Sequence, residues 1–150
     1  MTIVPRHYED LGVLHENTLP PHAYYVPASA ALAPDGMSGP DARDRSDRLQ
    51  PLSGTWRFRY HESVADVFWE PGYGADGELR GFSPIPVPST WQHQGYDCHQ
   101  YTNVRYPIPL DPPHVPYDNP AGAYLTDFIH TPDPDAPTVA LTFEGVDSCF

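Results

Sequence analysis

The chain has 150 residues, enough for one domain of ordinary size, and its 20 Asp and Glu against 8 Lys and Arg give a formal net charge of −12. Such an acidic surface repels a phosphate backbone, which excludes nucleic acid as a partner and suits an uncharged ligand. No apolar run reaches the roughly 18 residues of a membrane-spanning helix, the first residues lack the apolar core of a secretory signal, and two cysteines make no disulfide framework. A cytoplasmic location is therefore the default expectation.

Proline is the compositional outlier, at 20 of 150 residues against an average of roughly 5%. Because proline interrupts helices and central strands, long helices are not expected. A disordered chain and an all-β domain with long ordered loops would both accommodate this proline content. The 3 Trp, 10 Tyr and 6 Phe favour the all-β domain, since disordered segments are usually poor in aromatic residues.

Residues 1–50 show neither a helical nor a strand period. Within them, residues 19–27 place Tyr24 and Tyr25 between prolines and predict an extended strap whose aromatic side chains dock on a partner surface. The charged run at residues 41–50 is interpreted as a solvated connector, with a helical turn as the alternative. The predicted organisation is a strap and connector over residues 1–50, followed by a domain over residues 51–150.

Alternating apolar residues predict strands over residues 54–60, 124–130 and 138–146, the first with Trp56 and Phe58 facing inward. Residues 82–88 carry three prolines, which confine an extended segment to a sheet edge or to polyproline geometry. A proline-rich ligand for an SH3-like groove is the alternative for this segment. Because so few strands cannot close a sandwich, the sheet is expected to find its partners beyond Phe150 and the chain to be a poorly soluble fragment.

Residues 91–107 combine aromatic, amide and turn-forming residues in a mixture that no ordinary helix or strand requires. Aromatic faces stack on the CH face of a sugar ring, and amides hydrogen-bond its hydroxyls. The segment therefore predicts carbohydrate binding. For its rings, at Trp91, Tyr96, Tyr101 and Tyr106, the favoured interpretation is nevertheless packing of the loop against the domain, with stacking on a sugar as the alternative.

The same segment holds His93, Cys98 and His99, residue types that bind zinc. Their spacing matches no standard zinc site and a fourth ligand is missing, so metal binding is the disfavoured interpretation. Cys98 is instead expected to be a small, half-buried filler.

Four motifs together resemble the bacterial β-galactosidases of glycoside hydrolase family 2. Residues 88–107 follow the pattern P-S-x-W-Q-x-x-G-Y-D-x-x-x-Y-T-N-V-x-Y-P, and residues 52–58 resemble L-N/S-G-x-W-x-F. Residues 118–124 resemble E/D-N-P-x-G-x-Y, and residues 143–150 resemble F-x-G-V-x-S-x-F. Each motif alone is weak, but their order and spacing make the resemblance specific and extend it over most of the chain.

The resemblance implies an incomplete jelly-roll β-sandwich, of the galactose-binding-domain-like kind, preceded by an extended N-terminal strap. It also implies that the full protein hydrolyses terminal β-galactosides such as lactose with retention of configuration. That mechanism needs two carboxyl groups roughly 5 Å apart, and neither family motif for the two glutamates occurs in this chain. The fragment alone is therefore expected to be inactive, with catalysis in a later barrel domain.

Two residues take a substrate role from the resemblance: Asn103, the amide of Y-T-N-V, would hydrogen-bond the galactosyl ring, and Val104 would line the same pocket. The resemblance further implies Mg²⁺ and Na⁺, with ligands mostly outside this chain, a homo-oligomer, and contact with the barrel domain. Asp10, with Glu9 and the backbone near Val13, is a weak candidate for a structural magnesium site. The alternatives are a non-catalytic carbohydrate-binding or structural module, or a related β-glucuronidase or β-mannosidase.

Overall fold

The structure is a computed structural model, and it describes residues 5–32, 43, 45–67, 81–99 and 108–146. Its regular elements are strands β1 (Gly54–His61), β2 (Ser83–Val87) and β3 (Ala121–Leu125), with short 3₁₀ helices η1 (Arg6–Glu9), η2 (Val64–Asp66) and η3 (Trp91–Gln94). None of the helices in this described part is long and apolar enough to cross a membrane. The predicted all-β class is confirmed.

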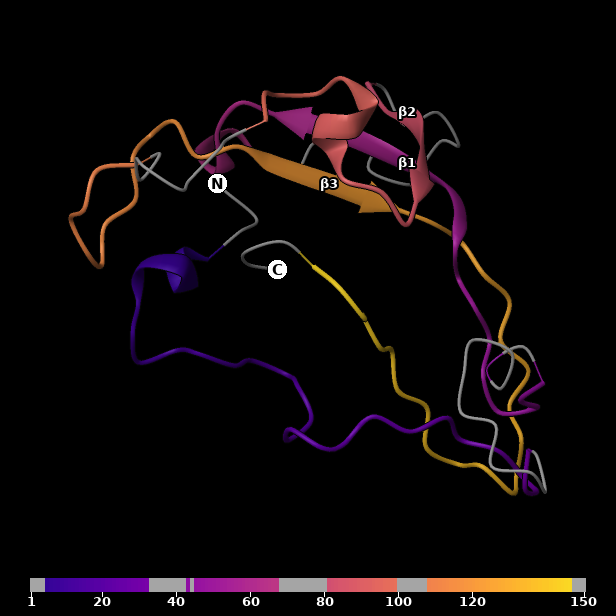
Figure 1. Cartoon of the computed structure of the whole chain (residues 1–150). Helices are drawn as coiled ribbons and strands as arrows, with labels where there is room; N and C mark the ends of the chain where they lie inside the picture. The colour runs from indigo at the N-terminus through magenta and orange to yellow at the C-terminus, as the bar shows by residue number, and fades with distance from the viewer. Residues whose placement is uncertain (1–4, 33–42, 44, 68–80, 100–107, 147–150) are drawn as a thin grey trace. The chain divides into compact units, whose positions relative to one another are not determined.

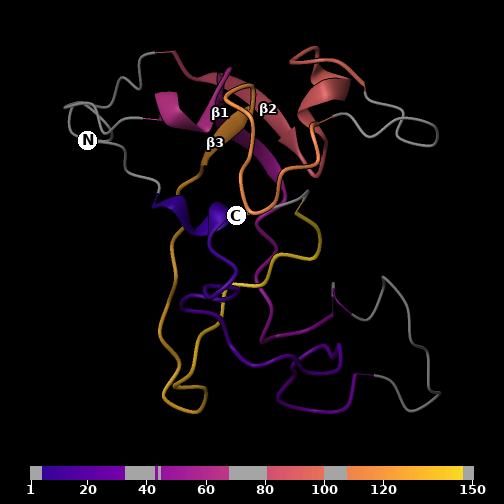
Figure 2. The same ribbon diagram turned by 90° about the vertical axis from the view of Figure 1, so that its left-hand side faces the viewer.

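The three strands form one antiparallel sheet in the order β2-β1-β3 (Figure 1). In the register of the sheet, Trp56 lies opposite Ile85 on one side of β1, and Phe58 lies opposite Tyr124 on the other. Turned by 90°, Figure 2 shows the same sheet with the neighbouring η3. The predicted strand over residues 54–60 and the predicted edge segment over residues 82–88 are both confirmed.

The two outer strands differ in the backbone groups that they carry on the side away from β1. Pro84 and Pro86 of β2 lie opposite Arg57 and Thr55 of β1. Proline has no N–H, so these two pairs cannot be the doubly hydrogen-bonded pairs of an antiparallel ladder. The backbone nitrogen and carbonyl of both prolines therefore point away from β1. The outer edge of β2 therefore lacks donors over most of its length, whereas β3 contains no proline and keeps its outward N–H groups.

One face of the sheet is aromatic and carries the core. Phe58 and Ile85 are each 1% exposed, and the ring of Tyr124 lies 4.7 Å from that of Phe58, centroid to centroid. Trp56, which the sequence also placed in the core, is only half-buried. The alternating pattern of β1 thus identified the inward face of the strand. Among its inward residues, Phe58 is the most deeply buried.

The predicted strand over residues 124–130 is confirmed only at residues 124 and 125 and is wrong over residues 126–130. β3 starts earlier, at Ala121, and ends at Leu125. Just beyond that end, the Asp127 carboxylate forms an ion pair with Arg57, a residue of β1. The alternation continues through Phe128, but that side chain is 52% exposed and has left the sheet.

The predicted strand over residues 138–146 is wrong, because these residues form neither helix nor strand. Their apolar side chains are exposed, with Val139 at 65%, Leu141 at 61% and Phe143 at 47%. The alternation is present, but a strand also needs a neighbour that completes the backbone hydrogen bonds. No strand in the described part of the chain pairs with this segment.

The chain divides into two compact units: Met1–Glu16 with Ser53–Asp127, which holds the sheet, and Asn17–Leu52 with Phe128–Phe150. In the second unit, residues 17–32 form neither helix nor strand, as expected for an extended strap, and Tyr24 and Tyr25 are about two-thirds exposed. The predicted boundary between residues 50 and 51 stays a prediction.

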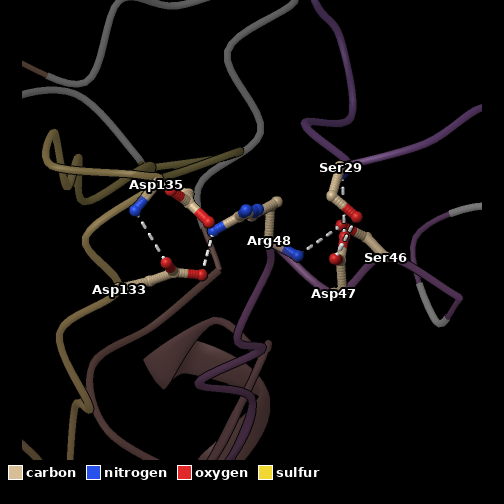
Figure 3. A network of polar contacts seen from close by, with 6 residues as sticks. All are labelled: Ser29, Ser46, Asp47, Arg48, Asp133 and Asp135. Atoms are coloured by element: carbon tan, nitrogen blue, oxygen red, sulfur yellow. Dashed lines mark hydrogen bonds and ion pairs between the residues drawn. The ribbon is translucent and has the colours of Figure 1, made fainter.

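The described part of the charged run forms the polar network of the second unit (Figure 3). Asp47 accepts hydrogen bonds from the backbone and the hydroxyl of Ser29, the former at 2.9 Å, and these bonds lower the pKa of its carboxyl. Arg48 forms an ion pair with Asp133, whose other carboxylate oxygen accepts from the Asp135 amide at 2.9 Å. Arg43 reaches Glu144 at 2.7 Å. These contacts lie between solvent-exposed groups, so the described part of the run is solvated and is also joined to residues far away in sequence. Its interpretation as a connector stays a prediction.

Candidate sugar-binding segment

The two residues to which the resemblance assigns a substrate role, Asn103 and Val104, lie outside the described residues, as do Tyr101 and Tyr106. The structure does describe the first part of the same motif, up to His99. The way in which residues 88–99 pack on the sheet places His99, the last described residue of the motif. The geometry of this part is therefore the described portion of the candidate site.

The motif begins with η3, which packs on the aromatic face of the sheet through Trp91. The Trp91 ring lies 6.1 Å from the Phe58 ring and 5.9 Å from the Tyr60 ring, the second contact being edge-to-face at 83°. The helix ends at Gly95, whose φ of 88° is the left-handed conformation that glycine adopts without cost. A hydrogen bond of 3.1 Å from the Tyr96 amide to the Trp91 carbonyl closes the turn.

Tyr96 returns the chain to the same aromatic face. Its ring meets Phe58 edge-to-face at 4.8 Å and 68°, and lies nearly parallel to the Tyr60 ring at 6.1 Å and 27°. Residues 91–96, which we call the 91–96 turn, are thus held to the sheet at both ends. For Trp91 and Tyr96 the prediction that their rings pack the loop against the domain is confirmed.

Gly122 of β3 allows this packing, although the sequence patterns predicted no role for it. An added Cβ at Gly122 would stand 2.6 Å from Phe58 Cε2 and 2.7 Å from Cε3 and Cζ3 of Trp91. The φ of Gly122 lies outside the left-handed region, so the close approach of two rings, and not backbone conformation, requires glycine here. A lone glycine inside a strand pattern was the available signal, since it often marks such an approach.

Polar groups occupy the outer side of the 91–96 turn and the residues after it. Thr90 Oγ1 lies 2.6 Å from His93 Nδ1, and the rings of His93 and His99 meet edge-to-face at 4.9 Å. Cys98 is a free, exposed thiol, which corrects its prediction as a half-buried filler; its amide bonds the Asp97 carboxylate at 2.7 Å. Among the described residues, no three His, Cys, Asp or Glu side chains could hold a metal ion together.

Burial and negative charge both act on the hydroxyl of Tyr60. Burial and then the carboxylates of Asp97, Asp118 and Glu62 raise the pKa of Tyr60 above its ordinary value of 10.0. The negative charge near this edge of the aromatic cluster disfavours an anion there.

Hydrogen bonds within the chain engage the carboxylates of the weak magnesium candidate, whose metal role stays a prediction. Asp10 is exposed and uses Oδ1 to accept the Gly12 amide at 2.8 Å. Glu9 uses both carboxylate oxygens, one for the Val115 amide at 3.1 Å and the other for Arg6 at 3.2 Å. Mg²⁺ demands a near-octahedral set of oxygens, and three of the four carboxylate oxygens of Glu9 and Asp10 accept hydrogen bonds from the chain. The Glu9 carboxylate instead connects η1 to Val115, which lies 106 positions later in the sequence.

The comparisons with known proteins agree with the motifs. The model of the glycosyl hydrolases family 2 sugar binding domain matches residues 49–150. A β-galactosidase of Actinobacillus pleuropneumoniae is 40% identical over 148 residues, and one of Staphylococcus xylosus is 36% identical over 143 residues. These matches cover 99% and 95% of this chain but 14% of each relative.

A β-galactosidase of Erwinia tasmaniensis is 38% identical over 149 residues, again with 99% of this chain and 14% of the relative covered. The aromatic sheet, the η3 packing and the motif that follows all lie inside the matched family domain, which is a β-sandwich. The chain belongs to glycosyl hydrolase family 2 and carries the sugar binding domain of that family.

Proposed function

We propose that this chain is the sugar-binding part of a β-galactosidase and that the whole protein hydrolyses terminal β-galactosides such as lactose. The observation that carries the proposal is the similarity to curated β-galactosidases over nearly the whole chain, at 36–40% identity. The packing of the 91–96 turn supports it, because the motif shared with that family begins on a rigid aromatic platform. Catalysis is assigned to the rest of the polypeptide, which would supply the two glutamates of a retaining mechanism.

Asn103 is proposed to bind the galactosyl ring and Val104 to line the same pocket. An amide accepts from one hydroxyl and donates to another, so it fixes the orientation of a polyol. A site built in this way discriminates strongly against sugars that lack the matching hydroxyl. The role of this chain in the reaction is therefore to bind and orient the sugar, with proton transfer and bond cleavage performed elsewhere.

Mg²⁺ and Na⁺ dependence is proposed for the whole enzyme and not for this chain. The carboxylates of Glu9 and Asp10 are used in hydrogen bonds within the chain, and no metal-holding group of three occurs among the described residues. Most ligands of both ions are therefore assigned to the remaining polypeptide. A cytoplasmic location, assembly into a homo-oligomer and contact with the barrel domain belong to the same proposal.

The test is to express the full reading frame that contains this chain and to assay aryl β-galactosides, β-glucuronides and β-mannosides side by side. Galactoside hydrolysis that exceeds the other two supports the proposal. We expect Asn103→Ala to lower kcat/KM for the galactoside by about 10²-fold or more, because the remaining hydroxyl partners are left unpaired. Preference for the glucuronide or mannoside would replace this function by a related family activity, and absence of all three activities would favour a binding module.

A further inference from the structure

Two neighbouring side chains hold the extended strap (residues 17–32) within the second unit. The Asp47 carboxylate accepts hydrogen bonds from the Ser29 amide, at 2.9 Å, and from the Ser29 hydroxyl. The Ser46 hydroxyl donates to the backbone carbonyl of Pro27. Figure 3 shows Ser46 and Asp47 next to Ser29. The strap is therefore fixed to this stretch at residues 27 and 29.

The same stretch also holds residues from the last part of the chain. Arg48 forms an ion pair with Asp133, and Arg43 forms one with Glu144 at 2.7 Å. These two pairs join residues 85 and 101 positions apart in the sequence. We call the four residues that make the contacts on both sides the clamp: Arg43, Ser46, Asp47 and Arg48.

A single hydroxyl group connects the two sides of the clamp. Ser46 Oγ, which donates to the Pro27 carbonyl, also accepts a hydrogen bond of 3.0 Å from the Arg48 amide. The Ser46 amide in turn donates to the Arg43 carbonyl at 3.1 Å. The backbone that directs the Arg48 side chain towards Asp133 is therefore fixed by the same group that binds the strap.

Solvent reaches both ion pairs of the clamp, because the side chains of all four partners are partly exposed. Ion pairs of this kind contribute little individually, and dissolved salt screens them. Contacts of low stability open locally while the rest of a protein stays folded. The clamp therefore combines long-range connections with a weak hold that depends on ionic strength.

We propose that the clamp is a salt-sensitive switch that opens and closes on both sides together, so that the strap and residues 133–144 gain and lose order as one unit. The cooperativity follows from the Ser46 hydroxyl, because loss of its bonds frees the Arg48 backbone as well as the Pro27 carbonyl. Release of the strap therefore weakens the hold on Asp133, and release of Asp133 weakens the hold on the strap.

The test is hydrogen exchange in the full-length protein, measured at one amide on each side of the clamp. The Ser29 amide donates to Asp47, and the Asp135 amide donates to Asp133 at 2.9 Å. Ser46→Ala leaves both acceptors in place. We expect it nevertheless to make both amides exchange about threefold to tenfold faster, since one lost hydrogen bond shifts an opening equilibrium by about this factor. Ser46→Thr, which keeps a hydroxyl group, should return both rates to those of the wild type.

Ser89→Ala is the matched control for Ser46→Ala. The Ser89 hydroxyl also donates to a proline carbonyl, that of Pro86 at 2.5 Å, but this bond spans three residues of the first unit. Neither the Ser29 amide nor the Asp135 amide should respond to it. Equal rates in Ser46→Ala and Ser89→Ala would overturn the inference. Faster exchange at only one of the two amides would also overturn it, because the two sides would then open independently.

The wild-type protein provides a second test that needs no substitution. The Debye length falls from about 30 Å at about 0.01 M salt to about 3 Å at about 1 M. Over this range the Ser29 and Asp135 amides should accelerate by the same factor, at least about threefold. Amides of β1 serve as the reference, because their bonds join uncharged backbone groups. Unequal acceleration of the two amides, or acceleration no greater than that of β1, would refute the switch.

Discussion

Replacing Phe58 by Ala tests whether the aromatic face is the core of the domain. Phe58 is 1% exposed and contacts three other rings, those of Trp91, Tyr96 and Tyr124. Truncation of a buried Phe to Ala costs about 3–5 kcal/mol through lost transfer free energy and the cavity left behind. We expect the upper part of this range, because edge-to-face ring pairs add about 0.5–1.5 kcal/mol beyond buried area.

The assay is native-state hydrogen exchange of the β1 amides in the full-length protein, which reports local opening where a global melt of several domains would not. At about 1.4 kcal/mol per factor of ten, the opening of β1 should become roughly several hundredfold to a few thousandfold more frequent. Phe128→Ala is the matched control, since Phe128 is 52% exposed, and its effect should stay within about tenfold. Equal effects of the two substitutions would refute the assignment of Phe58 to the core.

Two further predictions concern charge. Arg48→Met removes the ion pair with Asp133, so limited proteolysis should cut residues 128–136 faster than in the wild type. Arg57→Met is the control: its partner Asp127 is 85% exposed, so cutting of this segment should not change. Equal cutting in both variants would contradict the network. The second concerns alkaline stability: burial holds the folded-state pKa of Tyr60 above 10.0. The raised pKa of Tyr60 means that its neutral hydroxyl stabilises the folded state. This stabilisation is complete below pH 10 and is lost as pH rises through the folded-state pKa. Tyr60→Phe should therefore flatten the loss of stability above pH 10 in thermal melts, and an unchanged alkaline slope would count against the raised pKa.

The sheet was predictable where one strand carries enough information by itself. Alternation of Trp56, Phe58 and Tyr60 identified β1 and its inward face, and three prolines placed residues 82–88 at an edge. β3 was located less well, because its first residues, Ala121, Gly122 and Ala123, carry no apolar alternation. Its position follows from pairing with β1, which is a tertiary property.

Other features depend on contacts between residues far apart in the sequence. The 138–146 segment has the period of a strand, yet alternation cannot supply a neighbouring strand. The ion pairs of Arg43 and Arg48 join residues 101 and 85 positions apart, and a mixed-charge run gives no sign of such partners. For the candidate site, the motif indicated where the sugar-binding segment begins, and only the packing identified Gly122 as the residue that permits it.

The difference between the two outer strands also limits how copies of this sheet can associate. Edge-to-edge assembly into a filament requires two usable edges in each copy, so that every addition exposes a new one. With Pro84 and Pro86 facing outward from β2, only β3 offers a complete set of backbone partners. Pairing of β3 with β3 uses up that edge in both copies, so we expect such association to close as a twofold dimer and not to propagate.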